Sequence, residues 1–438
     1  MTDGYTSELA RELAPEALER FLRYVRVHTT SDPHSETFPS TAWQWDLLRL
    51  VEQELRELGL EGVELTEHGY VLATLPATVE HEVPTIGFLA HVDTFPGVPG
   101  ESVRPQVVTY EGGRLPLPGD PDVALDPDES PELAHHVGHE LVTSDGTTLL
   151  GADDKAGLAE IVAAFAYLAR HPEVPHGPLR LCANPDEEIG AGTDHLDLER
   201  FGCVAAYTLD GSTAGELEGE TFNALRAIVD FHGVSTHTGT AKGRLVNPLK
   251  VAGDFLASLP RDTLAPEVTE GYEGFVHPDE LHGTAERCRV ILILRDHDRD
   301  RLDDHAALVR RLADEAVARW PGSRVEVRLE EQYRNMKEDL DRDPRVLAAA
   351  EEAYRREGLE PKRVAIRGGT DGARLSEKGL PTPNLFTGGH DYHSRCEWAC
   401  VRDMGSAAAI VVRLAELWAE PGWAGAGDAV GAARPSSS

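Results

Sequence analysis

The chain has 438 residues, enough for two or three domains with large buried cores. Acidic residues outnumber basic ones by 76 to 42, which gives a formal net charge of −34. A surface of this sign repels nucleic-acid phosphates and anionic lipid, so we expect neither as a partner. Hydrophobic residues make up 41%, too many for a disordered chain, yet no stretch reaches the roughly 20 apolar residues that a membrane span requires.

The N-terminal sequence MTDGYTSELARE is acidic and polar, and it lacks the basic and apolar segments of a secretory signal. Five cysteines occur without a C-x-x-C pattern: Cys182, Cys203, Cys288, Cys396 and Cys400. No disulfide framework is expected, and we predict a cytoplasmic protein. Cys396 and Cys400 are spaced to share one face of a helix, but without a second cysteine pair a zinc–thiolate site is not expected.

Helical periodicity over 8–27 and 41–58 opens the chain, and Gly59 predicts the end of the second helix. Several apolar runs typical of strands follow, with one further helical segment among them. We expect strands at 63–75, 85–90, 140–144, 178–183 and 204–209, a helix at 155–170, and a loop-rich excursion at 96–131. Strands that alternate with helices indicate an α/β core.

The pattern changes near residue 220. Strands at 224–231, 288–295 and 324–329 enclose helices at 247–259 and 302–320, a set that suits a small two-layer sandwich. The α/β pattern then returns, with helices at 344–357, 370–378 and 403–420 and strands at 362–366 and 383–386. We therefore predict a discontinuous catalytic domain (1–219 and 333–423), an inserted smaller α+β lid domain (220–332) and a disordered tail (424–438).

Acidic and histidine side chains follow the ends of predicted strands in five places. In open α/β sheets, ligands bind at the carboxyl ends of the strands. Each segment alone has an ordinary explanation, such as a turn, a capped helix or a solvated acidic loop. Together they offer two histidines and four or five carboxylates, a mixture that suits a pair of divalent metal ions, zinc above all. The segments are His91-Val92-Asp93, Asp153-Asp154, Asp186-Glu187-Glu188, Asp210 and His390-Asp391-Tyr392-His393.

A second histidine cluster, His135-His136-x-x-His139, lies in the polar excursion, away from any predicted strand end. It lacks the H-E-x-x-H spacing of a helical zinc site. We predict that it is on the surface.

Longer segments resemble a known family from near the N-terminus to about residue 420. They are GFLAHVDT (87–94), LLGADDKAGLAEI (149–161), NPDEEIGAG (184–192), YTLDG (207–211), HTGTAKGRLVNPL (237–249), EVTEGYEGF (267–275), EQYRNM (331–336), IRGGTDGARLSEKGLPTPNLFTGG (366–389) and YHSRCEW (392–398). The chain resembles the peptidase T family of tripeptide aminopeptidases, within the co-catalytic zinc exopeptidase superfamily. The resemblance implies an α/β fold, a mixed-sheet catalytic domain with an inserted lid. It also implies tripeptide substrates and two Zn²⁺ per subunit, with cobalt or manganese as substitutes.

The resemblance also implies a role for each residue of the constellation. His91 and Asp210 would bind one zinc ion, Glu188 and His393 the other, and Asp153 would bridge both. Asp93 would orient His91, and Glu187 would be the general base. Three further residues would face the substrate: His237 at the scissile carbonyl, Arg367 at the C-terminal carboxylate, and Asn335 through hydrogen bonds.

Several alternatives remain open at this level. His390 stands where the family usually has no histidine and could compete with His393, and Cys396 stands where the family often has one. Arg367 could instead form a structural ion pair. A dipeptidase or an N-acyl amino acid deacylase would use the same metal site, and a non-enzymatic acidic cation-binding protein would need a degenerate one. The sequence does not decide the oligomeric state, for which a homodimer is one option.

Overall fold

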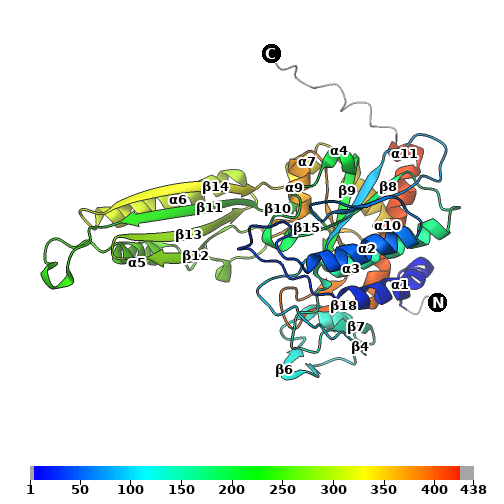
Figure 1. Ribbon diagram of the computed structural model, residues 1–438, viewed down its shortest axis with the longest axis horizontal. Helices are drawn as coiled ribbons and strands as arrows, with labels where there is room; N and C mark the ends of the chain where they lie inside the picture. The colour runs from blue at the N-terminus through cyan, green and yellow to red at the C-terminus, as the bar shows by residue number, and fades with distance from the viewer. Residues whose placement is uncertain (1–3, 425–438) are drawn as a thin grey trace, which may run out of the picture. The chain divides into compact units, whose positions relative to one another are not determined.

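The computed structural model describes residues 4–424 (Figure 1). Within them the chain forms two compact units. The first unit comprises residues up to Gly219, Glu338–Val364 and the residues from Thr370 onward, and the second comprises Glu220–Lys337 and Ala365–Gly369. The tail expected at 424–438 lies, apart from Ala424, outside the described residues.

A mixed sheet organises the first unit. Among the described residues it has eight strands in the order β1-β2-β8-β3-β9-β16-β10-β15. Strands β8, β3, β9 and β16 are parallel, so their carboxyl ends meet at one edge. The strands are β1 (Glu61–Leu65), β2 (Val71–Leu75), β3 (Ile86–His91), β8 (Leu179–Asn184), β9 (Ala205–Gly211), β10 (Glu216–Thr221), β15 (Lys362–Ile366) and β16 (Asn384–Phe386). The single strand expected at 63–75 is a hairpin, because the chain reverses between β1 and β2.

Helices cover both faces of this sheet. The nearly all-buried α3 (Ala152–Arg170) packs on β3 and β9, and α1 (Glu8–Tyr24) and α10 (Val401–Ala419) pack against it. The opposite face is covered by a smaller apolar cluster that includes Phe201 and Leu375. The remaining helices are α2 (Gln44–Glu57), which packs on β1 and β2, α4 (Leu198–Phe201), α7 (Lys337–Leu340), α8 (Arg345–Arg356), α9 (Asp371–Glu377) and α11 (Pro421–Ala424).

The excursion expected as a loop at 96–131 contains short strands. One small sheet has the order β17-β18-β7-β4, and β5 pairs with β6 beside it. The strands within 96–131, β4, β5 and β6, were not predicted because many of their side chains are exposed and β5 and β6 contain proline. The strands of both small sheets are β4 (Gln106–Thr109), β5 (Leu115–Leu117), β6 (Asp120–Leu125), β7 (Glu140–Thr143), β17 (Gly389–His390) and β18 (Trp398–Cys400), with a 3-10 helix, η1, at Pro131–His135. Cys396 precedes β18 and Cys400 ends it, so the shared helix face that their spacing would allow does not form.

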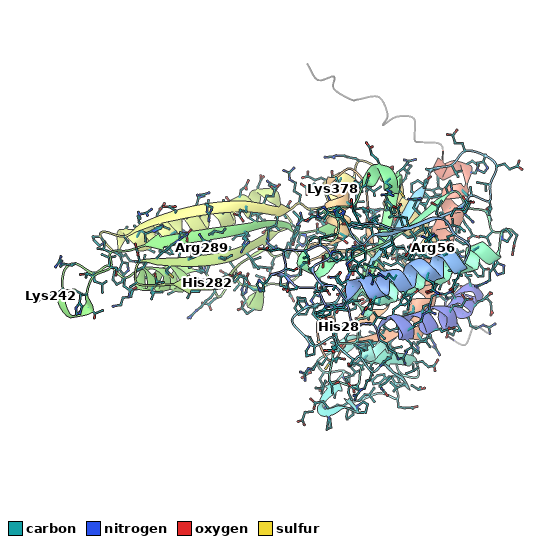
Figure 2. All side chains as sticks on the ribbon, in the orientation of Figure 1. His28, Arg56, Lys242, His282, Arg289 and Lys378 are labelled. Atoms are coloured by element: carbon teal, nitrogen blue, oxygen red, sulfur yellow. The ribbon has the colours of Figure 1, made fainter. Side chains whose placement is uncertain are left out.

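The second unit is an antiparallel sheet in the order β12-β13-β11-β14, with α5 (Pro248–Ser258) and α6 (Arg299–Ala318) packed on it (Figure 1). Its strands are β11 (Asn223–His232), β12 (Phe275–Gly283), β13 (Arg287–Asp296) and β14 (Arg324–Tyr333). The sequence did not predict β12, because most of its side chains are exposed and polar. Arg289, labelled in Figure 2, lies beside the buried Asp230 of β11.

In the part of the chain that the structure describes, no helix is both long and apolar enough to cross a membrane.

Candidate metal centre

The carboxyl edge of the parallel strands brings the predicted acidic and histidine residues together. His91 is the last residue of β3, and Asp210 lies near the end of β9. Glu187 and Glu188 follow β8 in the 3-10 turn η2 (Glu187–Ile189). All of these residues belong to the first unit. Because these strands are parallel, acidic and histidine residues from distant parts of the sequence lie at one edge of the sheet.

The carboxylate of Asp153 lies between two imidazoles. Its Oδ1 is 2.9 Å from Nε2 of His91, and its Oδ2 is 3.1 Å from Nε2 of His393. Each imidazole has a second carboxylate partner: Oδ1 of Asp210 is 3.7 Å from Nε2 of His91, and Oε2 of Glu188 is 2.9 Å from Nε2 of His393. The cluster therefore has two halves that share one carboxylate.

A buried glutamate positions Asp153. Glu397 is 1% exposed, and its carboxylate accepts hydrogen bonds from the backbone N–H groups of Leu150 (2.8 Å), Gly151 (2.7 Å) and Asp153 (3.0 Å). The Glu397 carboxylate thus fixes the backbone at the start of α3, and the Asp153 side chain extends from there to both imidazoles. Sequence reasoning gave Glu397 no role, although its spacing from His393 marked the segment.

The fully buried Asp93 orients two parts of the cluster. Its Oδ1 is 3.3 Å from Nδ1 of His91, which leaves Nε2 of the ring for the cluster. The same carboxylate accepts hydrogen bonds from the backbone N–H groups of Glu187 (3.0 Å) and Glu188 (3.2 Å). One carboxylate therefore sets both a histidine ring and the turn that carries the two glutamates.

The two glutamates differ in their surroundings. The Glu188 side chain is 4% exposed and contacts His393. Its second oxygen, Oε1, is buried without a hydrogen-bond partner. The Glu187 side chain is 16% exposed, and its Oε2 is 4.0 Å from Nε2 of His91. Glu188 is thus enclosed by the cluster, whereas Glu187 stands at its open side.

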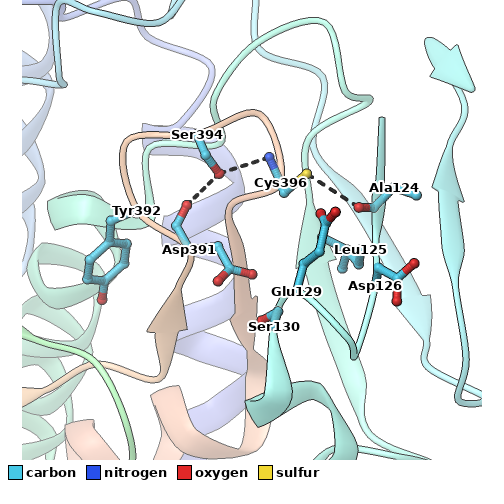
Figure 3. Close-up of a pocket in the computed structure, with 9 residues that line it drawn as sticks. All are labelled: Ala124, Leu125, Asp126, Glu129, Ser130, Asp391, Tyr392, Ser394 and Cys396. Atoms are coloured by element: carbon cyan, nitrogen blue, oxygen red, sulfur yellow. Dashed lines mark hydrogen bonds between the residues drawn. The ribbon is translucent and has the colours of Figure 1, made fainter. Parts of the chain in front are cut away.

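The loop that carries His393 is held from both sides. The His393 backbone has a φ of 59°, and its ring stacks on Phe95 with the ring centroids 4.1 Å apart. The hydroxyl of Tyr392 donates to the backbone carbonyl of Gly211 at 2.9 Å. A cavity of about 320 Å³ lies beside this loop, lined by Tyr392, Ser394 and Cys396 among others, but His393 is not part of its lining (Figure 3).

His393, and not His390, contacts the carboxylates of the cluster. Nδ1 of His390 faces the hydroxyl of Ser212 at 3.3 Å, and its ring stacks on Trp398. The structure thus places His393, and not His390, at the acidic cluster, and its role as a metal ligand stays a prediction.

Burial and mutual repulsion raise the pKa of three acidic groups of the cluster. Burial and the neighbouring Asp153 raise the pKa of Glu188 to about 8, and burial raises the pKa of Asp210 to about 6. Burial also raises the pKa of Glu187 well above its ordinary value. Burial alone would lower the pKa of His91, but its hydrogen bonds to Asp153, Asp210 and Asp93 raise it. The cluster carries more negative charge than its two imidazoles can neutralise.

This donor set fits two divalent cations. Imidazole nitrogens and carboxylate oxygens are ligands for zinc, cobalt or manganese, and no thiolate is present. Cations would relieve the repulsion between the carboxylates, and the unpartnered Oε1 of Glu188 is a free acceptor beside them. Asp154 supplies another buried oxygen without a partner, while its Oδ2 accepts from the backbone N–H of His91 at 3.2 Å.

Sequence reasoning missed the supports of the turn after β8. Asp186 has a φ of 60° and is buried, and its carboxylate accepts from the backbone and hydroxyl of Ser40 and from Nε2 of Gln44 (2.7 Å). The run of three carboxylates was therefore only partly a ligand set. Its first member anchors the turn, and nothing in the local sequence marks the distant partners.

The three residues predicted to face the substrate lie in the second unit. His237 is exposed and accepts the backbone N–H of Gly239 at Nδ1. Asn335 is 8% exposed, and its amide bonds Thr221, Lys337, His297 and Glu220. These hydrogen bonds occupy the Asn335 amide inside the second unit, and its predicted contact with the substrate stays a prediction.

Arg367 also has hydrogen-bond partners within its own unit, and its predicted contact with the substrate carboxylate stays a prediction. Its Nη1 donates to the backbone carbonyls of Gly271 (2.9 Å) and Glu273 (2.7 Å), and its Nη2 donates to the hydroxyl of Thr269 (3.0 Å). The fork formed by the two terminal nitrogens is thus already occupied. The alternative of an ion pair is not seen either, since no acidic side chain pairs with Arg367 among the described residues.

The surface cluster predicted at His135-His136-x-x-His139 is only partly exposed. His135 is exposed, but His136 is 7% exposed and His139 is half-buried. The polar sequence around them misled the prediction, because the small sheet of the excursion covers His136.

Comparisons with known proteins identify the family. The model of peptidase family M20/M25/M40 matches residues 128–417. The chain belongs to this family. It is 48% identical over 404 residues to peptidase T of Exiguobacterium sp., with 92% of this chain and 98% of that protein covered. It is 45% identical to peptidase T of Listeria monocytogenes over 92% and 99% of the two chains. The expected family and a hydrolase of the peptidase class are confirmed.

Solved structures confirm the fold class. Aminopeptidase PepT from Bacillus cereus superposes with a TM-score of 0.72 at 23% identity, covering 93% of this chain and 99% of that chain. The YXEP protein of Bacillus subtilis, described as a dinuclear metal-binding peptidase, superposes with a TM-score of 0.63 at 17% identity over 93% and 98%. These likenesses establish a mixed α/β fold with a smaller second unit.

Proposed function

We propose that this protein is an aminopeptidase that removes the N-terminal residue from tripeptides with the help of two divalent metal ions. The peptidase T relatives at 45–48% identity support the reaction and the substrate class. One observation within the site carries the metal part of the proposal: a single carboxylate, Asp153, faces an imidazole at each of its two oxygens. That is the arrangement expected of a bridging ligand between two cations.

Each half of the cluster would hold one ion. His91 and Asp210 would bind the first, His393 and Glu188 the second, and Asp153 both. Zinc is the proposed metal, with cobalt or manganese as substitutes. A metal pair at this position supplies Lewis acidity for a water molecule and for the scissile carbonyl. Asp93 contacts the His91 ring, and Glu397 accepts the backbone N–H of Asp153, so these two carboxylates hold the proposed ligands in place.

Glu187 is the proposed general base. Its carboxylate stands at the open side of the cluster, with Oε2 4.0 Å from Nε2 of His91. It would take a proton from the water as the water oxygen bonds to the carbonyl carbon, and would give that proton to the leaving nitrogen as the C–N bond breaks, so that no amide anion has to leave. The remaining negative charge at the site attracts the substrate's N-terminal ammonium. The exposed His237 is the proposed partner of the scissile carbonyl oxygen.

Metal content and product analysis test the proposal together. Purified protein is assayed for bound metal and incubated with tripeptides, dipeptides, longer peptides and N-acyl amino acids. We expect about two ions per chain at this centre, apart from any ion bound elsewhere in the chain, and release of the first residue from tripeptides only. Cleavage of dipeptides or N-acyl amino acids in preference to tripeptides would favour the dipeptidase or deacylase alternative. The cytoplasmic location and the homodimer option stay predictions.

A further inference from the structure

A second group of metal-binding side chains lies in the first unit, away from the proposed catalytic centre. It gathers three histidines, a cysteine and an aspartate from the small sheet and the start of α10. The group comprises His136, His139, His390, Cys400 and Asp403. None of these residues takes part in the contacts of the proposed catalytic centre. The cluster contains His136 and His139, two of the three histidines that the sequence placed on the surface.

The ligand atoms of this group are close to one another. Nδ1 of His136 is 3.3 Å from Nδ1 of His139, and the Cys400 Sγ is 3.8 Å from that same nitrogen of His139. Oδ2 of Asp403 is 3.8 Å from Nδ1 of His136. Two overlapping three-residue groups share His136, one completed by His139 and Cys400 and the other by His390 and Asp403.

Burial makes the group unlike a surface histidine patch. Cys400 is fully buried, His136 is 7% exposed and His390 is 4% exposed. Nε2 of His390 is buried with no hydrogen-bond partner. A buried polar nitrogen without a partner is costly and calls for an explanation. His139 is half-buried, so the cluster has one edge that solvent can reach.

From this geometry we propose that His136, His139 and Cys400 bind one transition-metal ion of the zinc class, with Asp403 or His390 as the further ligand. Two imidazoles, a thiolate and a fourth donor form a typical zinc ligand set. The Cys400 thiol and any protonated imidazole would release their protons on binding, as ligation requires. This site does not depend on the proposed function, because it shares no ligand with the catalytic centre.

The ion would have a structural role. His390 and Cys400 flank the loop that carries His393 and Glu397, and Cys400 immediately precedes α10. His136 and His139 lie between η1 and β7. A metal ion bound to both segments would therefore tie the strands at the base of the His393 loop to the segment between η1 and β7.

Cobalt spectroscopy on the full-length protein tests the proposal. Co²⁺ bound to a thiolate gives a charge-transfer absorption in the near ultraviolet, which a centre of histidines and carboxylates cannot give. We expect this band in the wild type, its loss in Cys400→Ser and its weakening in His139→Asn. Cys396→Ser and the exposed His135→Asn are the matched controls and should keep it. Absence of the band in the wild type, or its survival in Cys400→Ser, would overturn the proposal.

Zinc stoichiometry gives an independent measurement. After loading with Zn²⁺ and dialysis, we expect about one ion fewer per chain in Cys400→Ser and His139→Asn than in the wild type and His135→Asn. Because the comparison is a difference, it holds whatever number of ions the catalytic centre binds. Equal counts in all four proteins would contradict the site. Because His139 is half-buried, His139→Asn is expected to fold, and it tests the site if Cys400→Ser does not fold.

Discussion

The acidic pair after β8 shows how two adjacent residues of the same type acquire different chemistry. Asp93 accepts the backbone N–H groups of both Glu187 and Glu188, which fixes the turn between them. The Glu188 side chain then points into the cluster against His393, while that of Glu187 remains at the open side. Environment, and not residue type, separates a proposed ligand from a proposed base.

We expect Glu187→Gln to retain both metal ions and to lose about 10²–10⁴-fold in kcat, because the amide has nearly the same shape but cannot accept a proton. Glu188→Gln should instead weaken metal binding, since it removes a charged ligand. Metal analysis and steady-state kinetics on a tripeptide distinguish the two variants. If Glu188→Gln kept its metal while Glu187→Gln lost it, the two roles would be reversed.

Arg367 stabilises the second unit through three oxygen acceptors of one segment. Arg367→Ala should lower the free energy of unfolding by about 1–3 kcal/mol, because hydrogen bonds from a charged donor are lost. We expect its kcat/KM to change by the same factor on a tripeptide and on the matching tripeptide amide. A loss confined to the free acid would instead show that Arg367 binds the substrate carboxylate.

At the scale of elements, the start of α3 depends on a distant acidic side chain. Glu397 accepts three backbone N–H groups from the segment that leads to Asp153. Glu397→Ala leaves these donors buried without partners, at about 1–3 kcal/mol for each such group. We expect a lower melting temperature and weaker metal binding. Glu397→Gln keeps one acceptor oxygen and should lie between the alanine variant and the wild type in both measurements.

In the second unit, an ion-pair network links β11 to β13. Asp230 is buried, and its carboxylate accepts hydrogen bonds from Nε of Arg287 (3.0 Å) and from Nε and Nη2 of Arg289 (2.9 Å each). The hydrogen bonds from Arg289 and Arg287 outweigh burial and hold the pKa of Asp230 well below its ordinary value. The folded state therefore binds this proton less readily than the unfolded state does.

Because the pKa of Asp230 is lower in the folded state than in the unfolded state, its ionised carboxylate stabilises the fold at neutral pH. The contribution is complete above the ordinary aspartate pKa of about 4 and is lost as the pH falls toward the lower pKa of the folded state. We expect Asp230→Asn to lower the free energy of unfolding by about 1–3 kcal/mol at pH 7. Denaturant unfolding at several pH values should show this difference shrink below about pH 4. A difference that stayed constant with pH would exclude the ionised pair as its source.

For the whole molecule, metal removal should separate activity from folding. The sheet of the first unit is covered by α3, on which α1 and α10 pack, and the apolar side chains of these helices are not part of the metal cluster. Chelation should therefore abolish tripeptide hydrolysis while the far-ultraviolet circular dichroism spectrum stays unchanged, and added Zn²⁺ should restore activity. Unfolding on chelation would mean that the ions hold the fold itself, and full activity without metal would refute the two-metal proposal.

The sequence by itself determined the alternation of strands and helices, the insertion near residue 220 and the residues His91, Asp153, Glu187, Glu188 and Asp210 as a set. These follow from local periodicity and from the position of polar residues at strand ends. Parallel strands then have one edge in common, so residues at those ends must converge. For this reason the fold class and the main acidic cluster can be predicted from the sequence.

The residues that support this set, and the hydrogen-bond partners that occupy neighbouring polar side chains, became known from the folded structure alone. Glu397, the anchoring of Asp186 by Ser40 and Gln44, and the internal bonding of Asn335 all join segments far apart in the sequence. The same is true of Cys400 and His139, which lie 261 positions apart and meet across the small sheet. Local patterns record which residues are polar, but the hydrogen-bond partner of a buried polar group is set by packing over the whole unit.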